Sequence, residues 1–218
     1  MKDTKKLLIT AGHWRCPHGH NGLVHPACWE RFVANTADEF RVGYFDIEAT
    51  NLKADFGIML SYAFKVRGKD TIYSNVIQQK DIDSLKLDKP LVQQCLADME
   101  KFDMVVTYYG TGYDLPFVRT RALKWSLPFP EYGALIHLDL YYVARSKLKL
   151  SRTSLENVGK LIGVGELKNH LEPDIWTQAL LSKSARAYIL DHNKRDVVLL
   201  EKAHDRLIPY IKGIRRSI

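Results

Sequence analysis

Long apolar runs and cysteines are the two features that this sequence most clearly lacks. None of its apolar stretches approaches the roughly 20 residues needed to span a bilayer. Its opening residues, MKDTKKLLIT, do not contain a full signal-peptide core. It has only three cysteines, and two of them lie beside histidines, which is not the pattern of a secreted disulfide framework. We therefore expect an intracellular, cytoplasmic protein with no membrane partner.

Internal repeats and low-complexity stretches are also absent, and 218 residues suffice for one main domain with a small appendage. Apolar residues make up 46% of the chain, an ordinary share for a globular protein. Basic residues outnumber acidic ones, which gives a net charge of +7 and a pI near 9.2. This excess favours a polyanionic partner such as nucleic acid, although many basic proteins bind none.

Residues 1–40 form a segment rich in His and Cys that differs in pattern from the rest of the chain. Tetrahedral zinc needs four N or S ligands, and two close pairs separated by a short loop can supply them. The candidate ligands are Cys16, His18, His25 and Cys28, with His20 as an alternate for His18. We predict a small structural zinc-binding segment. The alternatives are a loop of unrelated polar residues and a disulfide between Cys16 and Cys28, which a reducing compartment disfavours.

Residues 41–218 show an α/β pattern of strands first and helices later. We expect strands over 41–49, 57–66, 71–77, 103–109 and 134–141, the last running into a helix. Further helices are expected over 89–101, from Asp114, behind a capping box of Thr153 and Glu156, and from Ala185. This order predicts a mixed five-stranded sheet with helices on both faces.

Four carboxylates stand at informative positions in this domain. Asp46 and Glu48 lie two apart in the strand-like run FDIEA, so both side chains point to one face, with Cα atoms about 6.6 Å apart. Like charges so close are unfavourable unless cations lie between them. Asp196 falls on the apolar stripe of the last expected helix, which also carries Tyr188. A buried acid needs a partner, and a pair of divalent metals would supply one for these three acids and for Asp114.

Several ordered motifs resemble those of DnaQ-like (DEDD) 3′–5′ exonucleases, which have the ribonuclease H fold. FDIEATNL resembles their first motif, TYYGTGYDLPF the second and HNKRD the third. The stretch HLDLYYVARSKLKLSRTSLENVGKLIGV is similar to the YprB-like branch of that superfamily. The resemblance covers about residues 41 to 210. It implies that Asp46, Glu48, Asp114 and Asp196 hold two Mg²⁺ or Mn²⁺ ions.

The third motif departs from the family pattern, which reads Y-x3-D or H-x4-D. This chain has His192-x3-Asp196, with the tyrosine spacing but a histidine. Residues i and i+4 share a helix face, so His192 can reach the metal site and serve as the general base. The alternative is that His192 only packs on the apolar stripe. A second departure is Tyr109, where relatives often have Asn.

Substrate contacts are expected beside the first and second motifs. The resemblance suggests backbone and hydroxyl contacts after the first motif, with Leu52 wedging against the terminal base. The candidates there are Ala49, Thr50, Asn51 and Leu52. The aromatic residues of the second motif could include a stacking platform for bases, against the alternative that they pack in the core: Tyr108, Tyr109, Tyr113 and Phe117. Candidates for phosphate contacts, against the alternative of a solvated face, are Arg119, Arg121, Arg145, Lys147, Lys149, Arg152 and Lys168. We interpret Asp139 as a helix cap and His204 as a structural residue outside the site.

These observations predict a two-metal 3′–5′ exonuclease that releases 5′-mononucleotides from single-stranded nucleic acid, with DNA favoured and RNA possible. One alternative is a catalytically silent nucleic-acid-binding module that uses the zinc segment, although the presence of all four acids argues against it. The other is an endonuclease or strand-transfer enzyme of the same superfold, in which the acid set normally lacks this tight D-x-E.

Overall fold

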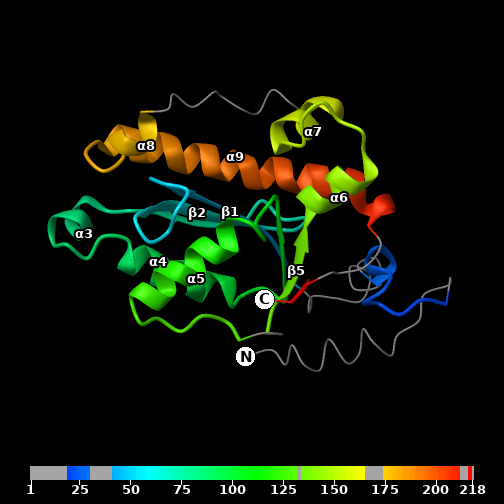
Figure 1. Ribbon diagram of the computed structural model, residues 1–218, viewed down its shortest axis with the longest axis horizontal. Helices are drawn as coiled ribbons and strands as arrows, with labels where there is room; N and C mark the ends of the chain where they lie inside the picture. The colour runs from blue at the N-terminus through cyan, green and yellow to red at the C-terminus, as the bar shows by residue number, and fades with distance from the viewer. Residues whose placement is uncertain (1–18, 30–40, 132–133, 165–173, 212–215, 218) are drawn as a thin grey trace.

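The core of the molecule is a mixed sheet with the strand order β3-β2-β1-β4-β5-β6 (Figure 1). The computed structural model describes residues 19–29, 41–131, 134–164, 174–211 and 216–217. The strands are β1 (Val42–Ala49), β2 (Met59–Val66), β3 (Ile72–Val76), β4 (Met104–Thr107), β5 (Ile136–Asp139) and β6 (Arg216–Ser217). All five expected strands are present, and the mixed sheet is confirmed. The expected count was one short, because the two-residue β6 pairs with β5 at the edge.

The direction of the strands changes in the middle of the sheet. β1 and β2, and likewise β2 and β3, are antiparallel, and Gly68 takes a positive φ of 66° in the turn that joins the last two. β1, β4 and β5 run parallel to one another. The carboxyl ends of parallel strands meet at the same edge of a sheet, so residues that follow β1, β4 and β5 come close together there.

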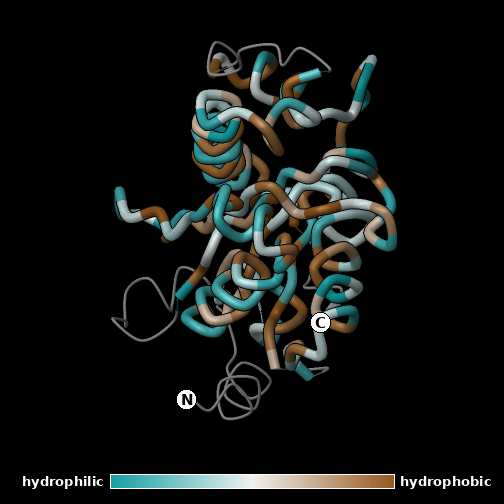
Figure 2. The backbone as a smooth tube through the Cα atoms, turned by 90° about the vertical axis from the view of Figure 1, so that its left-hand side faces the viewer, coloured by the Kyte–Doolittle hydropathy of each residue, from teal (hydrophilic) through white to brown (hydrophobic). Residues whose placement is uncertain are grey.

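Helices cover both faces of the sheet, as expected (Figure 1). On one side lie α4 (Lys89–Met99) and α5 (Asp114–Lys124); the other side carries α6 (Leu140–Lys147), α7 (Leu155–Leu161) and most of α9 (Lys183–Leu207). Successive residues of β1 belong to different apolar clusters: Phe45 packs with α4 and α5, and Tyr44 packs with α6, α7 and α9. Hydrophobic and hydrophilic residues alternate along the helices, as helices with one buried side require (Figure 2).

Helix α9 is the longest element and lies along β1 and β2. Its N-cap Ser182 accepts a hydrogen bond from the backbone N–H of Ala185, so the helix begins two residues before its expected start. Its buried side contains apolar residues together with His192, Asn193 and Asp196. Tyr188, expected on this stripe, is 36% exposed instead. His204 is buried and its Nδ1 lies 2.9 Å from the hydroxyl of Tyr44, which confirms its structural role.

Four short features differ from the expectation. The capping box at α7 is wrong: Ser154, not Thr153, is the N-cap, and its hydroxyl accepts from the N–H of Asn157 at 3.2 Å. The helices α3 (Gln79–Asp83) and α8 (Ile175–Gln178) were not expected, nor was the 3₁₀ turn η2 (Ile208–Tyr210). None of the helices in the described ranges has the length and apolar character to cross a membrane.

The zinc prediction falls on the N-terminal part of the chain, of which residues 19–29 are described. Cys16 and His18 lie outside the described residues. Within them, the rings of His20 and His25 meet edge to face with centroids 5.2 Å apart. The N–H of Cys28 donates to the carbonyl of His25 at 3.2 Å, so these two residues share one helical turn. The zinc site and the division at residue 40 stay predictions.

Candidate active site

Strand β1 presents Asp46 and Glu48 to helix α9. Their neighbour Ile47 packs in the cluster beneath the other face, so the alternation of a strand directs both acids toward the helix. Both acids are partly buried. At the end of β1, its pairing with β2 shifts in register between Glu48 and Ala49. The predicted common face of the two acids is therefore present in the structure.

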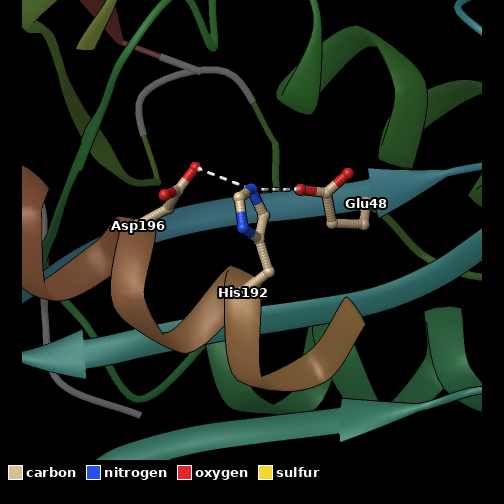
Figure 3. Close-up of side chains that lie close together, drawn as sticks. All are labelled: Glu48, His192 and Asp196. Atoms are coloured by element: carbon tan, nitrogen blue, oxygen red, sulfur yellow. Dashed lines mark ion pairs between the residues drawn. The ribbon is translucent and has the colours of Figure 1, made fainter. Parts of the chain in front are cut away.

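His192 lies between two of the acids (Figure 3). Its Nε2 is 3.8 Å from Oε1 of Glu48 and 3.7 Å from Oδ2 of Asp196. Among the described residues, one ligand atom from each of these three side chains falls within 4.8 Å of the others. The separations exceed those of hydrogen bonds, so Nε2 lies between the two carboxylates without bonding to either. The oxygens of Glu48 and Asp196 lie close enough together to share one small cation.

Asp114 hydrogen-bonds through its side chain to the backbone of β1 at the position between the two acids. It is the first residue of α5 and is 2% exposed, and its Oδ1 accepts from the N–H of Ile47 at 3.0 Å. Burial raises the pKa of Asp114 to about 7, backbone hydrogen bonds oppose the shift, and the nearby charges of Asp139 and Glu48 add to it. An ionised Asp114 is therefore costly here unless a cation lies close by.

Asn193 is a site residue that the sequence did not single out. It is fully buried next to His192 in α9, and its Nδ2 donates to Oδ2 of Asp46 at 3.2 Å. Its Oδ1 is buried with no hydrogen-bond partner within the described parts of the chain. A buried amide oxygen beside carboxylates is a further hard donor that a cation could use. Its place inside the HNKRD motif was the one available signal.

Trp176 is the second residue that sequence reasoning missed. Its indole Nε1 donates to Oε2 of Glu48 at 2.7 Å, from the short helix α8. This bond occupies one carboxylate oxygen and leaves Oε1 directed at His192 (Figure 3). Nothing in the sequence near Trp176 indicated this role, because a four-residue helix has no readable periodicity.

The last residue of β1 and the loop after it contain the expected substrate contacts 49–52. The side chain of Ala49 is buried, and the hydroxyl of Thr50 accepts from the N–H of Ile58 at 3.0 Å, which stabilises the loop. Asn51 is exposed and its Oδ1 accepts from the N–H of Lys53. Leu52 is 78% exposed, and a wedging side chain must be accessible.

The aromatic candidates divide into two groups. Tyr113 is close to the acids: burial raises the pKa of its hydroxyl, and the charges of Asp114, Glu48 and Asp46 raise it further, so this hydroxyl stays protonated. Tyr109 is 45% exposed. Phe117 is 2% exposed and packs in the core, so its expected contact with substrate is wrong.

The basic candidates likewise include both buried and exposed residues. Arg121 is 1% exposed, and its guanidinium donates to both oxygens of buried Asp88, at 2.7 and 2.6 Å. It is therefore a core ion pair and not a phosphate contact. Lys168 lies outside the described residues. The other candidates for phosphate contacts are exposed: Arg119, Arg145, Lys147, Lys149 and Arg152.

Asp139 caps helix α6, as predicted. Its carboxylate accepts from the N–H of Tyr141 at 3.1 Å. It also accepts from the N–H groups of Tyr109 at 2.8 Å and Thr111 at 2.9 Å, so one side chain fixes the start of α6 and the loop that leads to Asp114.

The comparisons with known proteins agree with this geometry. A family model described as the RNase H superfamily matches residues 43–208. A DNA polymerase of Methanocaldococcus jannaschii is 28% identical over 57% of this chain and 9% of its own length. The uncharacterized protein YprB of Bacillus subtilis is 28% identical over 72% of this chain and 39% of its own. A DNA polymerase of Archaeoglobus fulgidus is 21% identical over 74% and 23%.

Among solved structures, the family B DNA polymerase of Pyrobaculum calidifontis is similar in fold. The TM-score is 0.61 at 19% sequence identity, and the match covers 78% of this chain and 25% of the polymerase. The chain thus spans less than half the length of each of these relatives.

Proposed function

The chain belongs to the RNase H superfamily, and from this premise we propose that it is a metal-dependent 3′–5′ exonuclease. It hydrolyses the phosphodiester bonds of single-stranded nucleic acid and releases 5′-mononucleotides. DNA is the favoured substrate, because the polymerases similar to this chain are DNA polymerases. The observation that carries the proposal is the position of His192 Nε2 between the carboxylates of Glu48 and Asp196.

The donor set fits divalent Mg²⁺ or Mn²⁺. Carboxylates are the ligands that these hard cations prefer, and the four acids Asp46, Glu48, Asp114 and Asp196 would hold two ions. Burial already raises the pKa of Asp114, so a neighbouring cation would offset an electrostatic cost that is present in the protein. When bound, the ions lower the pKa of a water molecule and stabilise the departing 3′ oxygen.

His192 is proposed to take the proton of the attacking water. A histidine with an ordinary pKa of about 6.5 accepts a proton well near neutral pH. Helix α9 fixes its backbone and holds Nε2 between the carboxylates of Glu48 and Asp196. Asn193 and Trp176 hold the carboxylates of Asp46 and Glu48 in place through direct hydrogen bonds.

End-labelled oligonucleotides test this function. With Mn²⁺, single strands labelled at the 3′ end should release labelled mononucleotide at once, and strands labelled at the 5′ end should shorten stepwise. Circular single strands should stay intact. Cutting of circles would replace this proposal by an endonuclease, and release that survives Asp46→Ala would show a contaminant. No release from any substrate would favour a silent binding module.

We also propose a structural zinc ion in the N-terminal segment, held by Cys16, His18, His25 and Cys28, with His20 as the alternate ligand. The edge-to-face contact of the His20 and His25 rings, and the single helical turn that His25 and Cys28 share, support it. Elemental analysis of protein purified without chelator should find one zinc per chain, and Cys28→Ser should lower that content. Zinc-free protein that is folded would contradict it.

A further inference from the structure

Four tyrosines gather at the carboxyl ends of β4 and β5. The rings of Tyr109 and Tyr141 meet edge to face with centroids 4.8 Å apart, and Tyr141 meets Tyr142 in the same way at 5.2 Å. The ring centroids of Tyr109 and Tyr142 are 6.5 Å apart, with 35° between the ring planes. The rings of Tyr108 and Tyr141 meet edge to face with centroids 6.0 Å apart. Tyr109 is 45% exposed and the other three are half-buried. The cluster is therefore partly buried among its three other rings and exposes the ring of Tyr109.

The backbone holds Tyr109 in an unfavourable conformation to achieve this. Its φ of 68° is left-handed, which a bulky residue seldom adopts. Two hydrogen bonds from the loop to the carboxylate of Asp139 maintain it, one from Tyr109 itself and one from Thr111. The ring packs over Gly112, where a Cβ would lie 2.6 Å from Tyr109 Cζ, so only glycine leaves room for it. Strain retained around an exposed ring indicates a use for that ring.

The cluster is bordered by unneutralised positive charge. The hydroxyl of Tyr108 donates to the carbonyl of Thr153 at 3.3 Å, which brings the segment after α6 against the tyrosines. That helix and segment carry the exposed basic residues Arg145, Lys147, Lys149 and Arg152. Within the described parts of the chain, none of them has a carboxylate partner. Aromatic rings beside a basic border are the combination that binds a single strand, through its bases and its phosphates.

The cluster also lies next to the acids. Asp139, which holds Tyr109, also accepts from the N–H of Thr111, three residues before Asp114, the first residue of α5. The strands β1, β4 and β5 are adjacent and parallel, so their carboxyl ends place the acids and the tyrosines along one edge, about 10 Å apart over two strand spacings. A nucleic-acid strand that reached the acids along this edge would pass over the rings.

We propose that Tyr109, Tyr141 and Tyr142 form a stacking platform for unpaired bases of single-stranded nucleic acid upstream of the 3′ end. This inference rests on the proposed function, because it places the cleaved end at the acids. Stacking uses the face of the base, which every base has, so the platform binds without strong sequence preference. An end still paired in a duplex cannot lie on the rings, so the platform selects single strands.

The test measures affinity of the full chain for a labelled single-stranded 12-mer by fluorescence anisotropy, without added divalent cation so that the strand stays intact. Tyr109→Leu and Tyr142→Leu should each weaken binding about ten-fold, equivalent to about 1.4 kcal/mol. The matched Phe variants retain the ring and should bind within two-fold of wild type. Tyr210→Leu is the control, since Tyr210 is 48% exposed in η2 and outside the cluster.

Leu variants that bind within two-fold of wild type would overturn the platform, and so would Phe variants that lose as much as the Leu variants. A loss as large in Tyr210→Leu would show a general effect and would overturn it too. The function is read separately, as release of mononucleotide by the wild type with Mn²⁺. If the wild type releases mononucleotide but the Leu variants bind as tightly as wild type, only the platform is contradicted. If binding depends on the rings but no mononucleotide is released, only the exonuclease is contradicted.

Discussion

The indole Nε1 of Trp176 lies 2.7 Å from Oε2 of Glu48, although 128 residues separate the two in the chain. Glu48 belongs to the central strand β1 and Trp176 to the short helix α8 that precedes α9. The bond fixes the rotation of a carboxylate whose other oxygen faces His192. In metal sites, hydrogen-bond partners of this kind orient the ligand, and Trp176 would do so for Glu48 in the proposed site.

Trp176→Phe should therefore weaken Mn²⁺ binding about ten-fold or more, the usual effect of removing a residue that orients a metal ligand. Isothermal titration with Mn²⁺ measures it. Trp125→Phe is the matched control, because Trp125 also donates to a carboxylate, that of Asp88 at 2.9 Å, but belongs to the buried ion pair. Equal Mn²⁺ affinities of Trp176→Phe and wild type would leave the Trp176 bond without a role in the site.

His192→Ala should lower turnover by about 10²-fold or more if this residue is the general base. Mn²⁺ binding should persist, because the four acids stay in place. Single-turnover release of mononucleotide at saturating Mn²⁺ gives the rate, and titration gives the affinity. An unchanged rate would make His192 a packing residue of α9.

Stability without metal should fall as the pH rises from about 4 to about 7. Burial raises the pKa of Asp114 from 3.8 to about 7, so in this window the folded protein keeps a proton that the unfolded chain has released. Each pKa unit of this difference corresponds to about 1.4 kcal/mol in the free energy of unfolding.

Asp114→Asn should flatten this part of the pH profile and should raise metal-free stability at pH 7. Urea unfolding at several pH values, without divalent cation, measures both effects. Saturating Mn²⁺ should stabilise the wild type at pH 7 much more than the variant. A variant that keeps the wild-type slope between pH 4 and 7 would assign the dependence to another group.

Asp88→Ala should destabilise the protein by about 3–5 kcal/mol, because it leaves the guanidinium of Arg121 buried without its partner. The carboxylate also accepts from the N–H of Met59 at 2.9 Å. Lys160→Ala is the control: its ion pair with Glu156 is exposed, and such pairs contribute less than about 1 kcal/mol. Urea unfolding compares the two, and similar losses would contradict a structural role for the buried pair.

The sequence predicted those parts of the fold that depend on local pattern. Alternation along β1 gave Asp46 and Glu48 one face, and the stripe of α9 placed His192 and Asp196 on its buried side. Ser and Thr are both common helix caps, and Thr153 also has Glu156 three residues later, so the local pattern favoured the wrong one of two neighbours.

The remaining parts depend on contacts between distant residues. Arg121 has the pattern of an exposed helical residue until Asp88, 33 positions away, is seen beside it. Phe117 is the last residue of the second motif, yet the packing of α5 directs it into the core. The bond between Trp176 and Glu48 has no local signal at all, because α8 is too short for periodicity.

Crystals soaked in Mn²⁺ and measured for anomalous scattering test most directly whether four acids share two ions. We expect two strong peaks about 3.5–4 Å apart, bounded by the carboxylates of Asp46, Glu48, Asp114 and Asp196. Saturating Mn²⁺ with no peak among these side chains would contradict the proposed metal site and the exonuclease that depends on it.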